Sequence, residues 1–312
     1  MPVKVATCYL FHPIQNSELV KIEKDLEKTA DSLGVRGLVI LASEGFNTTL
    51  SGNETEILKL IQALFKIISY EGDIPFIKWS ENDKHPFRRF SAKVRDEIVT
   101  TSEPELNPMN TEIPYKSHLT PAEWDRTLKE EQEDIYLVDT RNWYETQIGS
   151  FKGAVKPPIS EFTEFSEFVE NQQLPKDKKI LMFCTGGIRC EKGILDLNQK
   201  GYENVFQLEG GILNYLKEFP DQEYEGECFV FDHRVSVDQN LEPSKQYRLC
   251  PHCGQPGEEV IECVRCDYET IICETCKGEM EKKEADTCSK NCAHHWQMRP
   301  GQKGPRQILN YE

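Results

Sequence analysis

The stretch KILMFCTGGIRCEK, at residues 179–192, decides how this chain is organised. It begins as a short apolar run, which predicts a buried strand, and the run ends at Cys184. Gly186, Gly187 and Arg189 follow, and then residues with helical spacing. Backbone N–H groups of such a loop, together with the positive end of the helix, favour a thiolate. We therefore expect a nucleophilic Cys184 at the end of a strand; a buried structural cysteine beside a glycine turn is the alternative.

The loop resembles the active-site loop of the rhodanese family, and the resemblance continues on both sides of it. Upstream, IYLVDTR at residues 135–141 resembles the strand of that family that ends in Asp-x-Arg. GSFKGA at residues 149–154 resembles its next segment, with Ser150 and Phe151 where His and Ile are usual. Downstream, VFQLEGGI at residues 205–212 resembles the closing strand and Gly-Gly turn.

The resemblance implies a rhodanese α/β domain with a central parallel sheet at residues 113–226. In such a sheet Cys184 lies at the carboxyl end of a strand, where ligands bind. By their place in the family pattern, Asp139 and Arg141 support the loop together with Gly186 and Gly187. An ordinary ion pair at a strand end is the alternative for Asp139 and Arg141.

Loop length separates two chemistries. Four residues lie between Cys184 and Arg189, whereas the phosphatases related to this fold use a longer loop to surround a phosphoryl group. The shorter loop favours a sulfur atom, as in a persulfide, and Arg189 could hold an anionic substrate or that persulfide. Cys190 follows directly; it is either a resolving thiol for Cys184 or a core cysteine in the first helical turn.

Length and composition limit the class of protein. A chain of 312 residues predicts two or three domains, and 29% charged residues with no long apolar run exclude a membrane-spanning segment. The start of the sequence lacks the pattern of a secretory signal peptide. Closely paired cysteines suit metal binding in a reducing cytoplasm better than a secreted disulfide framework. A net charge of −16 argues against nucleic-acid binding by the whole surface.

Residues 1–112 predict a ferredoxin-like α+β domain with the element order βαββαβ. The helical segments have caps: Ser17 is the expected N-cap of the first helix, Gly34 its end, and Asn53 the N-cap of the second. The turn at residues 43–47 could line a site but is interpreted as a hairpin turn.

Residues 84–95 are rich in cations and contain two phenylalanines, Phe87 and Phe90. Cations for phosphates and aromatic rings for unpaired bases are what single-stranded RNA requires. A solvated strand with an apolar inner face is the alternative. The candidate RNA-binding cations are Lys84, Arg88, Arg89, Lys93 and Arg95.

Residues 100–116 are polar and proline-containing, which is typical of a linker. Directly after it, Thr120, Pro121 and Glu123 predict a helix that starts with a capping box.

Residues 227–312 form a cysteine-rich module. Four close pairs supply eight thiolates, enough for two structural zinc sites with four cysteine ligands each. Spacing does not show which pairs share a metal, and metal-free cysteines are the alternative. The ligands are Cys250, Cys253, Cys263, Cys266, Cys273, Cys276, Cys288 and Cys292. The basic tail at residues 290–306 is a second candidate RNA contact.

Taken together, the three parts resemble one family, the rhodanese-like, oxygen-dependent tRNA uridine hydroxylases of bacteria. The nonapeptide CTGGIRCEK and the segment CFVFDHRV at residues 228–235 carry this resemblance. It implies formation of 5-hydroxyuridine at the wobble position, with tRNA as substrate and molecular oxygen as co-substrate. Two further hypotheses are a sulfurtransferase that carries sulfane sulfur as a Cys184 persulfide, and a zinc-ordered binding scaffold.

Overall fold

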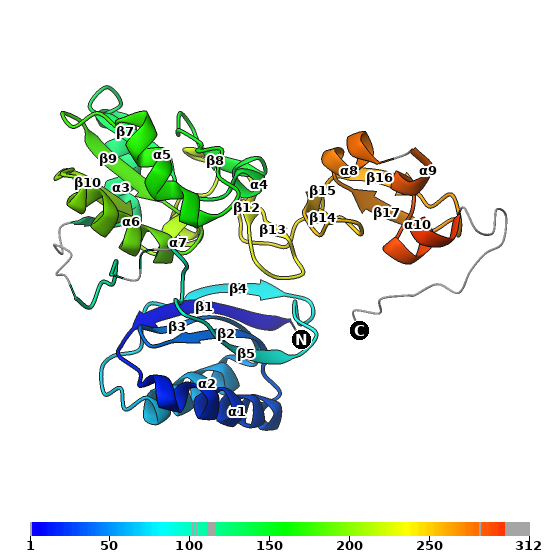
Figure 1. Cartoon of the computed structure of the whole chain (residues 1–312), viewed down its shortest axis with the longest axis horizontal. Coiled ribbons are helices and arrows are strands. Elements are labelled where there is room, and N and C mark those ends of the chain that lie inside the picture. Colours follow the sequence, from blue (N-terminus) through cyan, green and yellow to red (C-terminus); the bar gives the residue numbers. More distant parts are fainter. Residues whose placement is uncertain (1, 102, 104, 111–116, 281, 297–312) are drawn as a thin grey trace. The chain divides into compact units, whose positions relative to one another are not determined.

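The computed structural model describes residues 2–296 except 102, 104, 111–116 and 281. The chain forms two compact units (Figure 1). The first comprises residues 1–229 and 238–242 and contains an N-terminal α+β domain followed by a parallel α/β domain. The second comprises residues 230–237 and 243–312 and holds the cysteine pairs. No helix in the described part of the chain is long and apolar enough to cross a membrane.

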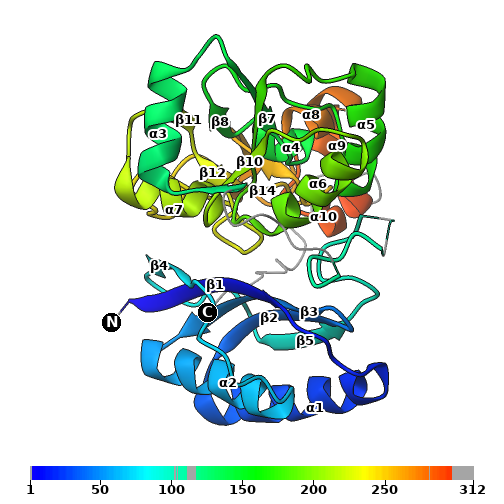
Figure 2. The ribbon, with the colours of Figure 1, turned by 90° about the vertical axis from the view of Figure 1, so that its left-hand side faces the viewer.

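The N-terminal domain has the ferredoxin-like order that the sequence predicts, with one added strand. Its five-stranded sheet runs β4-β1-β3-β2-β5, antiparallel except for the parallel pair β2 and β5. Two helices cover one face of the sheet (Figures 1 and 2). The elements are β1 (Val3–Phe11), α1 (Asn16–Leu33), β2 (Arg36–Ala42), β3 (Gly45–Gly52), α2 (Glu54–Ile67), β4 (Lys78–Asn82) and β5 (Phe90–Val94).

Two of the three predicted helix signals are confirmed. Gly34 ends α1 with φ 65°, a left-handed conformation that glycine adopts freely. Asn53 caps α2 by accepting the Thr55 N–H at 2.9 Å. The prediction for Ser17 is wrong, because α1 already begins at Asn16. The start is set by Ile14, whose side chain is buried and whose N–H donates to Ser43 O at 2.9 Å, so a tertiary contact overrides the local cap.

The α/β domain is built on a parallel four-stranded sheet of order β6-β10-β9-β7. Figure 2 shows α3 and α7 on one side of this sheet and α5 and α6 on the other. Strands β8 and β11 pair antiparallel beside it. The elements are β6 (His118–Leu119), α3 (Pro121–Glu130), β7 (Ile135–Asp139), α4 (Trp143–Thr146), β8 (Gly149–Phe151), a 3-10 turn (Phe162–Glu164), α5 (Phe165–Gln172), β9 (Lys179–Phe183), α6 (Ile188–Gln199), β10 (Val205–Leu208), α7 (Gly211–Glu218), β11 (Tyr224–Gly226) and β12 (Cys228–Phe229).

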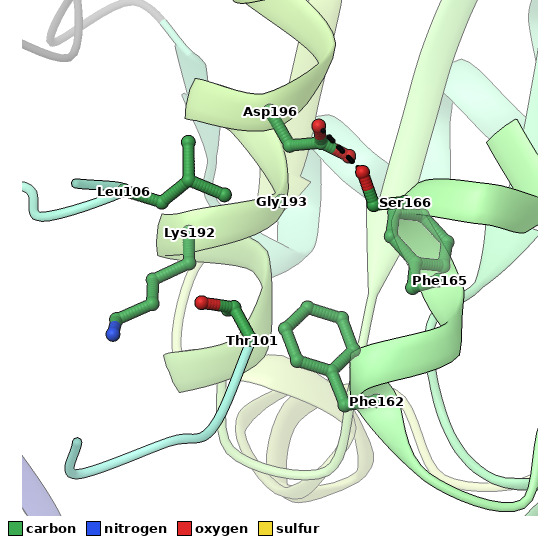
Figure 3. A pocket seen from close by; sticks show the side chains of 8 residues that line it. All are labelled: Thr101, Leu106, Phe162, Phe165, Ser166, Lys192, Gly193 and Asp196. Atoms are coloured by element: carbon green, nitrogen blue, oxygen red, sulfur yellow. Dashed lines mark hydrogen bonds between the residues drawn. The ribbon is translucent and has the colours of Figure 1, made fainter. Parts of the chain in front are cut away.

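Local signals for this domain are confirmed as well. Thr120 and Glu123 form the predicted capping box at the start of α3. In the preceding linker Leu106 is 2% exposed and, with Thr101, lies against α5 and α6 around a small hollow (Figure 3). The hollow measures about 10 Å³, room for one water at most. It is therefore part of the packing that holds the linker rather than a ligand site.

The second unit has short strands and little apolar core. Strands β14 and β15 pair antiparallel, as do β16 and β17. Its buried clusters consist mainly of cysteines, joined by Ile272 and Ala285. The few buried aliphatic groups leave this unit with a small hydrophobic core. The elements are β13 (Ser236–Val237), β14 (Arg248–Leu249), β15 (Pro256–Gly257), β16 (Glu259–Glu262), β17 (Glu269–Ile272), α8 (Glu274–Glu279), α9 (Lys282–Ala285) and α10 (Lys290–Trp296).

Candidate active site and metal centres

Cys184 lies where the sequence places it, between strand β9 and helix α6. The strand ends at Phe183 and the helix begins after Gly187. Gly187 has a φ of 98°, in the left-handed region that glycine adopts freely. The Gly187 N–H donates to Cys184 Sγ at 3.1 Å. The carboxyl end of a central strand, a glycine turn and a helix N-terminus thus meet at one thiol.

The surroundings of Cys184 favour its anion. Burial raises the pKa of this thiol, but the Cys190 thiol, the Arg189 charge and the backbone N–H groups of Arg189 and Gly187 more than compensate, and they lower it to about 6. At neutral pH most of Cys184 is therefore thiolate.

Cys190 belongs to the same site. Its side chain is 0% exposed, lies beside Cys184 and is 3.6 Å from Thr140 Oγ1. Burial and the neighbouring Cys184 raise the pKa of Cys190 well above the ordinary value. The two cysteines therefore form a thiolate–thiol pair in which Cys190 donates to Cys184.

Two buried arginines have different surroundings. Arg189 Nη1 lies 2.8 Å from Glu145 Oε2, so a carboxylate balances its charge next to the loop. Arg141 Nη2 lies 2.7 Å from Asp139 Oδ2 and donates to Gly149 O at 2.6 Å. The structure thus brings Arg189 to the thiolate, whereas Asp139 and Arg141 join the end of β7 to β8.

Ser150 and Phe151, which depart from the rhodanese pattern, have structural contacts. Ser150 Oγ donates to Asp139 Oδ2 at 2.7 Å. The ring of Phe151 packs edge to face against Phe183 and Tyr215, both with centroids at 4.8 Å. The departure therefore changes the scaffold of the domain rather than the thiolate loop.

The second Gly-Gly turn holds the loop in place. The Ile212 N–H donates to Cys184 O at 3.0 Å, and the Leu213 N–H donates to Thr185 O at 3.2 Å. A Cβ atom on Gly211 would lie 2.5 Å from Cys184 O, so only glycine permits this close approach.

Sequence reasoning missed the contacts that the N-terminal domain makes with the loop and α6. Tyr9 donates to Glu191 Oε1 at 2.8 Å, and Lys78 Nζ donates to Gly186 O at 3.0 Å. One hint was available, since the last two residues of the nonapeptide, Glu191 and Lys192, place two charges on a helix that packs against a core.

Lys192 is paired across the domains. Its ammonium lies 2.9 Å from Glu44 Oε2 and 2.6 Å from Glu97 Oε2, and all three side chains are at most 5% exposed. Glu44 belongs to the predicted hairpin turn, which does connect β2 and β3. That turn therefore also supplies an anion that holds α6.

The candidate RNA-binding cations lie on the surface. All five side chains at positions 84, 88, 89, 93 and 95 are exposed. Phe90 packs partly against the core of the N-terminal domain, and Phe87 is half-buried. In the basic tail, Arg299, Lys303 and Arg306 lie outside the described residues.

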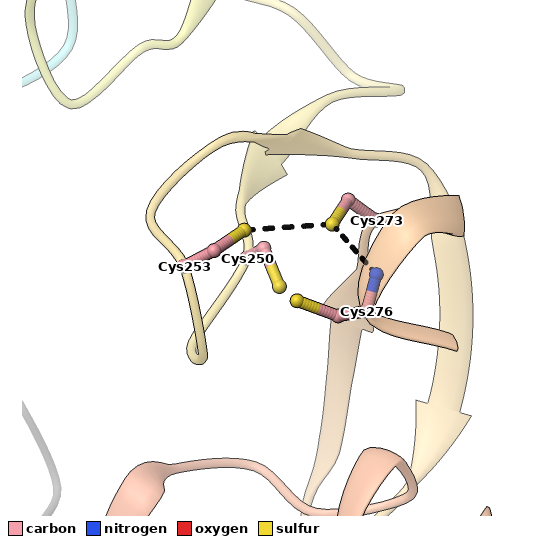
Figure 4. Close-up of side chains that lie close together, drawn as sticks. All are labelled: Cys250, Cys253, Cys273 and Cys276. Carbon is pink, nitrogen blue, oxygen red and sulfur yellow. Dashed lines mark hydrogen bonds between the residues drawn. The ribbon is translucent and has the colours of Figure 1, made fainter. Parts of the chain in front are cut away.

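The eight paired cysteines form two groups of four, and the pairs are interleaved. The first pair joins the third, Cys250 and Cys253 with Cys273 and Cys276 (Figure 4). The second pair joins the fourth, in a group of Cys263, Cys266, Cys288 and Cys292. The ligand sets left open by spacing are thus crossed.

The sulfur positions fit a tetrahedral metal ion. Within each group all Sγ atoms lie within 4.8 Å of one another. Cys253 Sγ is 3.5 Å from Cys273 Sγ, and in the other group the Cys288 to Cys292 distance is 3.7 Å. Four sulfurs bound to zinc at about 2.3 Å stand about 3.8 Å apart. All twelve cysteines of the chain are described and free of disulfides, so both groups can offer four thiolates.

A thiolate loop between a parallel strand and a helix defines a rhodanese-like protein, and family comparison gives the same class. Residues 120–218 match the rhodanese-like domain. Residues 3–98 match the "UPF0176 acylphosphatase like domain", and residues 225–293 match "Rhodanase C-terminal".

Curated relatives match across all three parts. A tRNA uridine(34) hydroxylase of Bdellovibrio bacteriovorus is 53% identical over 95% of this chain and 83% of its own length. Proteins of the same name from Prochlorococcus marinus and Bartonella bacilliformis are 41% and 39% identical, over 81% and 86% of this chain and 79% and 88% of their own. The chain belongs to the family of the tRNA uridine(34) hydroxylases.

Proposed function

We propose that this enzyme converts uridine 34 of tRNA, the wobble uridine, to 5-hydroxyuridine, with Cys184 as nucleophile and molecular oxygen as oxidant. The observation that carries the proposal is the buried Cys184 thiolate, whose pKa is lowered to about 6 by Cys190, Arg189 and the loop N–H groups. The names of the relatives supply the substrate and the reaction class.

The chemistry starts with conjugate addition. The Cys184 thiolate attacks C6 of uracil, and the electron pair of the C5=C6 bond makes C5 electron-rich. One atom of oxygen then enters at C5. Loss of the C5 proton and expulsion of the thiolate restore the ring.

The electron balance assigns a role to Cys190. Insertion of one oxygen atom leaves the second to become water, which requires two electrons and two protons. Two thiols provide both when Cys184 and Cys190 close to a disulfide. Uridine, oxygen and the dithiol then give 5-hydroxyuridine, water and the disulfide, and an external thiol restores the enzyme.

The remaining predicted residues support this centre. Arg189 stabilises the thiolate, and Gly186 and Gly187 shape the loop. The Asp139–Arg141 pair holds the end of β7, which lies beside the end of β9, where the loop begins. The domain limits 1–112, 113–226 and 227–312 stay a prediction, as does a cytoplasmic location, where tRNA is found. Zinc at the two cysteine groups would fold the C-terminal module and take no part in the reaction.

The test uses the full chain, a tRNA transcript and oxygen labelled with the heavy isotope. Mass spectrometry of the nucleosides should find one labelled oxygen in 5-hydroxyuridine. Cys184→Ser should keep the fold and form no product. Without added thiol, the wild-type protein should stop after about one turnover and contain a Cys184–Cys190 disulfide. Product formation by Cys184→Ser would contradict the proposal.

A second candidate function is sulfur transfer through a Cys184 persulfide. The observation that favours it is the short loop, with N–H groups gathered around one sulfur atom. Thiocyanate formation from thiosulfate and cyanide measures it. A rate that disappears in Cys184→Ser, with no hydroxylated nucleoside in the labelled-oxygen assay, would select this function instead.

A further inference from the structure

Three side chains of the N-terminal domain lie near the Cys184 loop and the Gly-Gly turn that holds it. Tyr9 lies on β1, Lys78 begins β4, and Phe76 precedes Lys78 by two residues. Lys78 Nζ lies 4.7 Å from the Tyr9 ring centroid and 5.8 Å from that of Phe76. Tyr9, Phe76 and Lys78 are called here the lysine–aromatic cluster.

Within this cluster Phe76 is the most exposed side chain. It is 50% exposed, whereas Lys78 is 7% and Cys184 2% exposed. Phe76 also adjoins the turn that holds the loop, because a Cβ atom on Gly210 would lie 2.8 Å from its ring. An exposed aromatic ring beside a cation is the combination that binds unpaired bases.

Lys78 is a buried cation directed at the loop. Among the described residues its hydrogen bond goes to Gly186 O at 3.0 Å, and an ammonium group has three donors. Burial lowers the pKa of Lys78, while the negative charges of Cys184 and Glu191 act in the opposite direction. The charge of this lysine therefore depends in part on the negative charge held at Cys184.

We propose that the lysine–aromatic cluster is the subsite for the target pyrimidine base, with Phe76 stacked on the ring and Lys78 donating to the carbonyl oxygen at C4. This inference rests on the proposed function, because it assumes attack by Cys184 at C6. In that step the sulfur electron pair forms the C6–S bond, and the C5=C6 pair moves towards C4. Negative charge leaves the sulfur and develops on the C4 oxygen, where an oriented cation stabilises the transition state.

The N-terminal domain is then part of the active site, and two substitutions in the full chain separate its contributions. Phe76→Ala should raise KM for an anticodon stem–loop about tenfold through loss of stacking, with kcat and Cys184 alkylation unchanged. Phe76→Tyr should restore KM. Lys78→Met should lower kcat about 100-fold, as for loss of one donor to a developing oxyanion, and Lys78→Arg should restore part of it.

Matched controls come from α1, which covers one face of the N-terminal sheet. Val20, 53% exposed, and Lys21, also exposed, take the substitutions Val20→Ala and Lys21→Met, and both variants should behave as wild type. Wild-type kinetics for Phe76→Ala and Lys78→Met, with an inactive Cys184→Ser, would overturn the subsite alone. An active Cys184→Ser would overturn the proposed function instead. If circular dichroism shows that Lys78→Met is unfolded, the half-exposed Phe76 decides the question.

Discussion

A comparison of three buried cysteines of the first unit shows how the loop changes the pKa of a thiol. Cys8, Cys184 and Cys228 are all at most 2% exposed. Burial raises the pKa of Cys8 and of Cys228 to about 12, whereas that of Cys184 falls to about 6. Since burial acts alike on all three, the difference comes from the N–H groups, Arg189 and Cys190.

Alkylation should report this difference directly. At pH 7 iodoacetamide should modify Cys184 far faster than Cys8 or Cys228, because only Cys184 is mainly thiolate. Its rate should rise with pH through about 6, the pKa of this thiol, and then level off. Cys190→Ala should move that midpoint upward by removing a donor. Peptide mass spectrometry measures each rate, and similar rates for all three cysteines would contradict the argument.

At the residue scale, sequence could identify the groups that lie close together along the chain. Cys184, Arg189 and Cys190 fall within one loop and one helical turn, so local geometry suffices to bring them together. The hydrogen bond from Lys78 to Gly186 joins positions 108 residues apart, and the one from Tyr9 to Glu191 joins positions 182 apart. Such contacts depend on how two domains pack, which leaves no periodic pattern in the sequence.

Helix α6 connects the chemistry to the N-terminal domain. Its first turn carries Arg189 and Cys190. Lys192, two residues after Cys190, is fully buried and lies between Glu44 and Glu97. Burial tends to raise the pKa of Glu97, but Lys192 and Thr101 hold it below its ordinary value. Both carboxylates therefore depend on one ammonium.

Lys192→Met should destabilise the first unit by about 3–5 kcal/mol, because it leaves buried carboxylates unpaired. The pKa of Glu97 is depressed in the folded protein, so the pairing contributes fully above the unfolded carboxyl pKa of about 4.3 and is lost as pH falls through the lower folded value. Urea midpoints of wild type and variant should therefore differ most at neutral pH and converge in acid. Lys59→Met, at a surface pair with Glu56, is the control and should change little.

The two groups of four cysteines allow a test of the crossed pairing. Cys253 and Cys276 belong to one group of four in the structure, whereas a sequential arrangement would put them in different sites. The double substitution Cys253→Ser/Cys276→Ser should therefore lower the zinc content from about two to about one ion per chain. Elemental analysis measures it, with Cys8→Ser as a control that keeps both ions. A zinc-free double variant would indicate sequential sites.

The whole molecule has the wrong sign of charge for its substrate. A net charge of −16 repels tRNA, and a zinc ion bound by four thiolates is itself anionic. Binding must therefore use a local cationic surface. We predict that the exposed cations at positions 84–95 form such a surface. They belong to the N-terminal domain, which also supplies the lysine–aromatic cluster.

Removal of Arg88 and Arg89 together should weaken tRNA binding, because each neutralised phosphate releases condensed counterions. Both side chains are exposed, so the fold should persist and Cys184 alkylation should stay unchanged. The slope of log affinity against log salt should flatten by about 1.4–1.8, the value for two contacts. Filter binding over a salt series measures this, with Lys21→Met as a control for loss of a cation elsewhere. An unchanged affinity and slope would make this segment an ordinary solvated strand face and turn attention to the basic tail from Lys290.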